Sequence, residues 1–269
     1  MACRLSMLNL SAALIISAAA CLGAPVGATP IRQAGAPLDT SIRNEADHAV
    51  DLASAWLAAR QREDGAWGTE TGRVERTALA LLALTARADR HSDAVARAAV
   101  WLDRHAPCAS APAETYAWRL IALLSAAPAS PARSALSRRL LDEARPHAPP
   151  PDAPVSVRLL WNDALRLAGE SPAQAVLTEA PQLLDRHAAA WPPPIRDPSP
   201  LWDAVHLISR LADGALLRNG EPLDWRTDSA RELINLQRRD PAGGAYWGPE
   251  DGDTRIRETA FGLLVLHEL

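Results

Sequence analysis

The sequence contains no lysine, because all 28 of its basic residues are arginine. A catalytic Schiff-base lysine and the lysine of a phosphate-binding loop are therefore excluded. The formal net charge is -4, so the chain lacks the basic field that attracts nucleic acid, and we expect no nucleic-acid partner. The nucleophile elbow Gly-x-Ser-x-Gly and the dinucleotide-binding fingerprint are absent as well.

Cysteine is scarce, with three residues in a chain of 269. Cys3 and Cys21 lie in an apolar N-terminal segment, which leaves only Cys108 in the remainder of the chain. No intramolecular disulfide is possible within that remainder, so its stability must come from packing.

The N-terminal segment has the layout of a secretory signal peptide. Arg4 is followed by no further charge for more than twenty residues, and Leu8 to Cys21 form an apolar run. The small residues that follow offer a cleavage site after Ala28. We therefore expect residues 1–28 to be a signal peptide, residues 29–40, rich in Pro, Gly and Ala, to be a linker, and the mature protein to be periplasmic or secreted.

Two alternatives to this cleavage remain open. Ala18-Ala-Ala-Cys21 resembles a bacterial lipoprotein signal, although the leucine usual three residues before the cysteine is missing. Contact with a membrane is expected only if Cys21 is lipidated. An uncleaved anchor helix is the second alternative, since about 20 apolar residues can span a bilayer, but Gly23, Pro25 and Gly27 oppose it.

From Ile42 onward, apolar residues recur with helical spacing, and we expect one all-α domain over residues 41–269. The pattern predicts five pairs of helices. The pairs span 42–61 with 75–89, 91–105 with 114–127, 130–145 with 155–168, 171–188 with 200–217, and 225–238 with 255–268. One leucine late in each first helix marks the repeat, namely Leu57, Leu102, Leu141, Leu184 and Leu233. A spacing of roughly 45 residues is typical of stacked helical hairpins.

The first and last pairs share a loop motif. Gln61-Arg-Glu-Asp-Gly-Ala-Trp-Gly68 and Gln237-Arg-Arg-Asp-Pro-Ala-Gly-Gly-Ala-Tyr-Trp-Gly248 each join two predicted helices. The glycines allow backbone angles that other residues avoid, and the aspartates can accept bonds from nearby backbone amides. We expect the glutamines to satisfy exposed helix ends, and Trp67 and Trp247 to fill the gaps between hairpins. A binding or catalytic role for these two tryptophans is the alternative.

The paired motif resembles the prenyltransferase/squalene-oxidase repeat of the terpenoid cyclase and protein prenyltransferase superfamily. The likeness is good over 56–84 and 231–266 and only periodic between them. The resemblance implies an α/α toroid of about five hairpins, whose second helices line a central cavity. It also implies an apolar or isoprenoid small-molecule ligand for that cavity.

The catalytic motifs of that superfamily are not present. The nearest stretch to the Asp-x-Asp-Asp motif of cyclases is Asp251-Gly-Asp253-Thr254, which lacks the last aspartate. Protein prenyltransferases hold zinc with Asp, Cys and His, but Cys108 falls in a predicted loop without matching ligands. We therefore expect no cofactor and no metal.

Six polar residues are candidates for a site at the rim of the predicted cavity. They are Glu75, Glu114, Arg158, Asp203, His206 and Glu258. The three glutamates stand near the starts of second helices, where each can compensate a helix dipole by ~0.3–1 kcal/mol or belong to a ring of acids. Together with the other three, they could bind a polar ligand or serve acid/base chemistry.

Three other sequence patterns contain residues that can bind metals, but we expect each of them to lie on the surface without a metal. Glu45-x-x-His48 has the spacing of a helical ligand pair, but the second copy that a two-metal site needs is missing. The acidic run Glu250–Asp253 can hold calcium or form a solvated turn, and we expect the turn. Three Asp-Arg-His runs place cations near helix ends, as the helix dipole favours.

Two functions stay open, and the sequence does not decide whether the chain is an enzyme. The first is a non-catalytic ligand-binding or scaffold module. The second is a divergent enzyme, cyclase-like or acting as a lyase on acidic polysaccharide, an analogy of fold alone. A cyclase requires a closed apolar chamber with an acid at its top, a lyase an open groove lined with arginines, and a scaffold a centre filled by side chains. The oligomeric state is open as well.

Overall fold

The computed structural model describes residues 38–69, 72–171, 178–191, 196–211 and 216–269. The expected signal peptide and most of the expected linker, residues 1–28 and 29–40, lie outside the described residues. The described part is dominated by α-helices, with only short two-residue strands, so the expected all-α class is confirmed.

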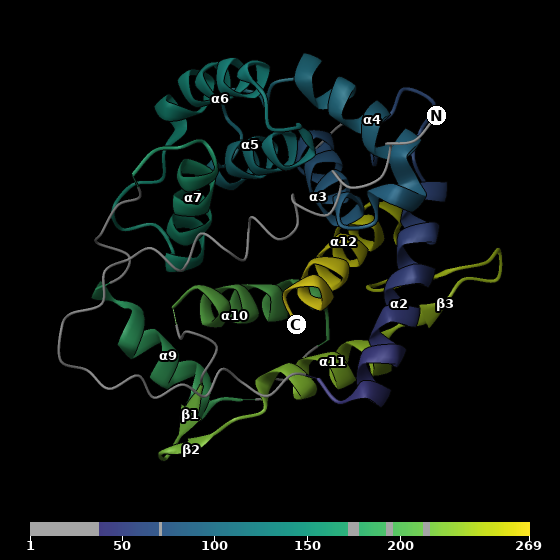
Figure 1. Ribbon diagram of the computed structural model, residues 1–269, viewed down its shortest axis with the longest axis vertical. Helices are drawn as coiled ribbons and strands as arrows, with labels where there is room; N and C mark the ends of the chain where they lie inside the picture. Colours follow the sequence, from purple (N-terminus) through teal and green to yellow (C-terminus); the bar gives the residue numbers. More distant parts are fainter. Residues whose placement is uncertain (1–37, 70–71, 172–177, 192–195, 212–215) are drawn as a thin grey trace, which may run out of the picture.

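Helices alternate along the chain between the periphery and the centre of the molecule (Figure 1). The peripheral helices are α2 (Thr40–Ala59), α4 (Ala88–Arg104), α6 (Pro131–Ala144), α9 (Ala180–Ala189) and α11 (Trp225–Leu236). The central helices are α3 (Arg73–Thr85), α5 (Ala113–Ala126), α7 (Val155–Leu167), α10 (Pro198–Leu211) and α12 (Gly252–Glu268). A short 3-10 turn, η2 (Arg145–His147), follows α6. These helices match the five predicted pairs.

Local sequence signals explain where several helices begin. Asp39 caps α2 by accepting a hydrogen bond from the backbone amide of Ser41 at 2.8 Å. Ser130 caps α6 in the same way, and Pro131 occupies the first turn, where its missing N–H is not needed. Asp224 and Asp251 cap α11 and α12.

The fourth pair differs from the prediction. Helix α10 ends at Leu211 rather than continuing to residue 217, and residues 217–218 (β1) pair instead with residues 221–222 (β2). The two-residue turn between them is Asn219-Gly220, and both residues have positive φ, 55° and 83°. Asn-Gly is a strong signal for such a hairpin, and helical periodicity alone misses it. Helix α9 also begins later than expected, at Ala180, while residues 172–177 lie outside the described part.

A second small hairpin lies within the last loop motif. Strand β3 (Arg238–Arg239) pairs antiparallel with β4 (Ala245–Tyr246). These two-residue ladders were not predicted, because they are too short to carry an alternating apolar pattern. Neither hairpin changes the helical class.

The central helices pack against one another in chain order, α3 with α5, α5 with α7, α7 with α10 and α10 with α12. Helix α12 also contacts α3, and α2 contacts both α11 and α12. The first hairpin (α2–α3) therefore lies beside the last hairpin (α11–α12), as Figure 1 shows. One hydrophobic cluster includes buried residues from all five central helices. Among the helices described, none has the length and apolar character needed to cross a bilayer.

Candidate functional site

Trp67 is a buried structural residue of the first hairpin. Its indole N–H donates to the carbonyl of Leu57 at 2.7 Å, and its backbone N–H donates to Thr77 Oγ1 at 3.1 Å. The side chain is fully buried. It thus ties the end of α2 to the start of α3.

Trp247 repeats this arrangement in the last hairpin. Its indole N–H donates to the carbonyl of Leu233 at 2.7 Å, and its backbone N–H donates to Thr259 Oγ1 at 3.1 Å. This side chain is also fully buried. Neither tryptophan presents a surface to solvent, so the geometry of both agrees with the structural role expected for them.

The loop glutamines connect each hairpin to its neighbour. Gln61 Nε2 donates to the carbonyls of Gly65 at 2.9 Å and of Ala94, in α4, at 2.8 Å. Gln237 Nε2 donates to the carbonyl of Ala49, in α2, at 2.9 Å. The expectation that the glutamines satisfy exposed helix ends was wrong, because Ala94 and Ala49 lie inside α4 and α2. Each glutamine instead joins its loop to the neighbouring peripheral helix.

The register of these contacts is the same in both places. Ala94 and Ala49 lie 45 residues apart in sequence, the spacing that separates Leu102 from Leu57. The contact of α2 with the loop of the last hairpin, at Ala49, is therefore equivalent to the contact of α4 with the loop of the first hairpin, at Ala94.

The aspartates of the loops accept the expected backbone hydrogen bonds. Asp64 accepts from the amide of Ala66 at 3.2 Å, and Asp240 accepts from the amide of Ala242 at 2.8 Å. Asp240 also accepts from Trp56 Nε1 at 2.6 Å and pairs with Arg60 at 2.7 Å. The hydrogen bond from Trp56, followed by that from Ala242, lowers the pKa of the Asp240 carboxyl.

The loop of the second hairpin has no tryptophan corresponding to Trp67. Arg119 makes the equivalent contact there. The side chain is buried in α5, and its Nε donates to the carbonyl of Leu102 at 3.0 Å. Leu102 corresponds to Leu57, which Trp67 caps in the first hairpin. The guanidinium also pairs with Glu143 of α6 at 2.6 Å. The sequence reading missed this residue, because an arginine inside an apolar stretch gives no motif.

Two of the predicted rim residues are brought together by Arg257. The guanidinium of Arg257 lies 3.2 Å from Glu75 Oε1 and 2.8 Å from Glu258 Oε1. Glu258 is almost fully buried, and its other oxygen accepts a hydrogen bond from the backbone amide of Ser199, at the start of α10, at 2.9 Å. Burial raises the pKa of the Glu258 carboxyl, while Ser199 and Arg257 oppose that shift. Glu258 thus compensates the dipole of α10 rather than that of its own helix.

Of the four predicted rim acids, Asp203 and Glu114 form no hydrogen bond or ion pair within the described part of the chain. The side chain of Asp203 is exposed, yet surrounding protein partly desolvates the carboxyl and raises its pKa. His206 and Arg257 oppose this shift, and Glu114 reinforces it. Glu114, in the first turn of α5, is therefore near enough to interact with Asp203 electrostatically.

His206 lies one turn beyond Asp203 and is buried rather than at the rim. The imidazole stacks on Trp202, with ring centroids 4.7 Å apart. Its Nε2 lies 3.1 Å from Asp163 Oδ2, outside hydrogen-bond geometry, and neither ring nitrogen has a hydrogen-bond partner in the described residues. Burial of Asp163 opposes its ionisation, but His206 and Arg210 more than offset that effect and hold the pKa of this carboxyl well below its usual range.

Arg158 is directed to a different partner from the other candidates. Its guanidinium forms two hydrogen bonds with the carboxylate of Glu179, at 3.0 and 2.7 Å. The predicted rim set therefore separates into a Glu75–Arg257–Glu258 group, an Asp203–Glu114 group, a buried His206 and a paired Arg158.

Aromatic side chains fill the space between three central helices. The ring centroid of Trp118 in α5 lies 5.9 Å from those of both Trp202 in α10 and Phe261 in α12. Trp202 and Phe261 are 6.4 Å apart. All three side chains are buried.

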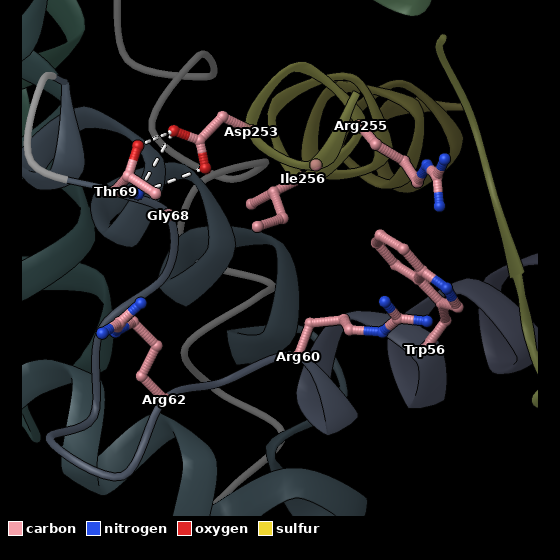
Figure 2. Close-up of a pocket in the computed structure, with 9 residues that line it drawn as sticks. Trp56, Arg60, Arg62, Gly68, Thr69, Asp253, Arg255 and Ile256 are labelled. Atoms are coloured by element: carbon pink, nitrogen blue, oxygen red, sulfur yellow. Dashed lines mark hydrogen bonds between the residues drawn. The ribbon is translucent and has the colours of Figure 1, made fainter. Parts of the chain in front are cut away.

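A pocket of about 180 Å³ lies between the first and last hairpins. It is lined by the end of α2, the loop after it and the start of α12, as Figure 2 shows. The charged lining residues are Arg60, Arg62, Asp253 and Arg255. The sequence reading did not select these arginines, because the pocket forms only where the two ends of the chain meet.

The acidic run before α12 makes internal contacts. Asp251 accepts from the amide of Thr254 at 3.0 Å, and Asp253 accepts from the amide of Thr69 and pairs with Arg76 at 2.9 Å. Among the described residues, no group of three or more His, Cys, Asp or Glu side chains could hold a metal ion.

The sequence matches no protein-family model and no curated protein. The likeness to the terpenoid cyclase and prenyltransferase superfamily therefore rests on the paired loop motifs.

Proposed function

We propose that the chain is an exported α/α-toroid module that acts as a non-catalytic binding or scaffold protein. The contacts of α12 with α3, and of α2 with α11, support closure of five hairpins into one ring. The shared register of the Gln61 and Gln237 contacts supports it as well, because the last hairpin then relates to the first as neighbouring repeats do.

The observation that carries the non-catalytic proposal is the packing of Trp118, Trp202 and Phe261. Their buried rings pack together between α5, α10 and α12, whereas a cyclase of this architecture needs an empty apolar chamber between its central helices. An apolar or isoprenoid ligand would have to displace these rings, at the cost of buried aromatic contacts. A filled centre is what a scaffold requires.

Titration of the purified chain with an isoprenoid alcohol, followed by tryptophan fluorescence, tests this proposal. The scaffold predicts no saturable change, whereas Trp118→Ala should create a cavity that binds the alcohol. Saturable binding by the unchanged protein, or turnover of a prenyl diphosphate, would overturn the proposal. The signal-peptide layout of residues 1–28 supports export. N-terminal sequencing and mass spectrometry of the protein from fractionated cells would test cleavage of this segment and lipidation at Cys21.

Asp203 favours one second candidate, an enzyme that uses the rim for acid/base chemistry. Its carboxyl is exposed and has a raised pKa, which suits a general acid. If this candidate holds, Asp203→Asn abolishes product formation from an acidic polysaccharide or a prenyl substrate. Glu75→Gln should reduce product formation only slightly. The absence of any product from the unchanged protein would end this candidate.

A further inference from the structure

We propose that Asn219 is a modification site, where the chain converts the side-chain amide into a carboxylate through a cyclic imide. The products are aspartate and isoaspartate. Asn219 and Gly220 form the turn between β1 and β2, at the edge of the molecule in Figure 1. The reaction involves this turn alone, so it is independent of whether the chain is a scaffold or an enzyme.

The turn lies outside the ladder of its hairpin. The ladder joins residues 217–218 to residues 221–222 and leaves the two turn residues unpaired. Both turn residues are exposed, and both have positive φ, 55° at Asn219 and 83° at Gly220. Water therefore reaches the reacting groups, and no ladder bond has to break before the side chain of Asn219 rotates toward the backbone.

The reacting groups are neighbours in the chain. The backbone nitrogen of Gly220 attacks Cγ of Asn219 and closes a five-membered imide ring, while the Cγ–Nδ2 bond breaks. The proton of the Gly220 amide leaves with Nδ2 as ammonia. Water then opens the ring. Cleavage of the bond between the Gly220 nitrogen and Cγ gives aspartate, and cleavage of its bond to the backbone carbonyl carbon of Asn219 gives isoaspartate. Water is the only co-reactant, and no electrons are exchanged.

Gly220 favours the attack because it has no side chain beside the attacking nitrogen. A Cβ built at Gly220 would meet no atom of the described chain within 4 Å, apart from its own neighbours in sequence. No other described segment therefore covers the turn on this side. Asparagine also tolerates the left-handed angles that the first turn position requires. The residue types that build the turn thus also supply its reaction.

The other asparagines in the described part of the chain lie inside helices. Asn44 and Asn235 are exposed, in α2 and α11, and Asn162 is buried in α7. A helix holds the backbone around each asparagine in hydrogen bonds, so it must open locally before an imide can form. Each of the three also precedes a residue with a side chain. Exposure alone therefore does not distinguish Asn219, but the turn and its glycine do.

Conversion of Asn219 should loosen the hairpin from its neighbours. Arg218 donates to the carbonyl of Trp191 at 2.8 Å, and the indole of Trp191 donates to Asp228 of α11 at 3.3 Å. Isoaspartate lengthens the backbone by one methylene, so the turn no longer has the two-residue length that fits the strands. Both products add a negative charge at the tip. We therefore expect the contact between Arg218 and Trp191 to weaken, while the contacts between the first and last hairpins persist.

Incubation of the folded full chain at mildly alkaline pH, with peptide mass spectrometry at intervals, tests the proposal. The peptide that contains Asn219 should exchange NH2 for OH at least about tenfold faster than those with Asn44 or Asn235, which react only when their helices open. Fragmentation by electron transfer distinguishes isoaspartate from aspartate, and both should appear. Hydrogen exchange of residues 217–222 should be faster in the converted protein, and an unchanged rate there would contradict the loosening.

Two variants separate this chemistry from general instability. Asn219→Gln keeps the amide but lengthens the side chain, which disfavours ring closure, and it should stop the conversion. Gly220→Ala adds a side chain beside the attacking nitrogen and should slow the conversion. Asn235→Gln, at an exposed position of α11, is the matched control and should leave the conversion of Asn219 unchanged. The proposal is overturned if Asn219 stays unmodified in the folded chain, if it converts no faster than Asn44 and Asn235, or if aspartate is its only product.

Discussion

The side-chain amide of Gln237 donates a hydrogen bond to the backbone carbonyl of Ala49, 2.9 Å away, across 188 residues of sequence. Gln61 makes the same contact with Ala94 at 2.8 Å across 33 residues. One local interaction thus joins neighbouring hairpins near the start of the chain and also joins its last hairpin to its first.

Gln237→Ala should lower the free energy of unfolding by about 0.5–1.5 kcal/mol, because one hydrogen bond is lost while the carbonyl of Ala49 keeps its partner within α2. Gln61→Ala should lower it by at least as much, since it removes the equivalent bond to Ala94 and a second bond to the carbonyl of Gly65. Chemical denaturation of both variants gives the comparison. A neutral Gln237 variant beside a destabilised Gln61 variant would show that the long-range bond does not form.

Gly244 and Gly243 form a matched pair of substitutions. Both have positive φ, so Gly→Ala at either position should cost about 1–2 kcal/mol in backbone strain. A Cβ at Gly244 would lie 2.9 Å from Trp56 Cβ and 3.0 Å from the carbonyl oxygen of Leu52, whereas at Gly243 it meets open space.

Gly244→Ala should therefore destabilise the protein by about 1–3 kcal/mol more than Gly243→Ala, as overpacking does. Urea denaturation measures the difference. Equal losses would mean that α2 does not press against this loop.

Trp67→Ala and Trp247→Ala should each cost about 3–5 kcal/mol, because each removes a fully buried indole. Trp→Phe at the same positions keeps part of the buried ring packing and loses the bond to Leu57 or Leu233, so each Phe variant should lose less stability than its Ala counterpart. Calorimetry of the four variants gives the values. An unchanged Tm for either alanine variant would remove the structural role of that tryptophan.

His267 should make stability depend on pH. Burial lowers the pKa of this imidazole to about 4, and nearby Arg87 acts in the same direction. In the unfolded chain the imidazole has the usual histidine pKa of about 6.5. Between pH 6.5 and pH 4, His267 therefore binds a proton in the unfolded chain but not in the folded one. The free energy of unfolding therefore falls as pH is lowered through this window, by a total on the order of 3 kcal/mol, and then levels off.

Denaturation of His267→Gln at several pH values checks this dependence. The variant should show a flatter profile between pH 6.5 and 4, because the titrating group is gone. His48→Gln, which replaces an exposed imidazole on α2, serves as the control and should keep the original slope. Parallel profiles for all three proteins would contradict the assignment.

Periodicity in the sequence was enough to predict the five helix pairs, and the loop motif was enough to predict the turns made by its aspartates. Leu57 and Leu102 have equivalent places, and Asp64 and Asp240 make the backbone contacts expected of them. These features depend on residues close together in the chain. The repeat spacing therefore carried the information directly.

Other features depend on which helices meet, which local patterns do not encode. Arg119 replaces Trp67 in the second hairpin, and Glu258 caps a different helix from its own. His206 is turned into the interior beside Trp202 rather than toward the rim. The Asn219-Gly220 turn is an exception, because the sequence carries a local signal for it. The helical periodicity of the preceding residues led to the prediction of a longer helix instead.

Intrachain crosslinking tests ring closure most directly. Thr69→Cys and Asp253→Cys, in a chain whose three natural cysteines are replaced by serine, put thiols on side chains that contact each other across 184 residues. A closed ring predicts rapid crosslinking within one chain by a short bismaleimide, seen as a faster-migrating band on a denaturing gel. Thr69→Cys with Glu221→Cys, on the hairpin at the opposite edge of Figure 1, should not react in this way. Equal, slow reaction of both pairs would contradict the closed ring.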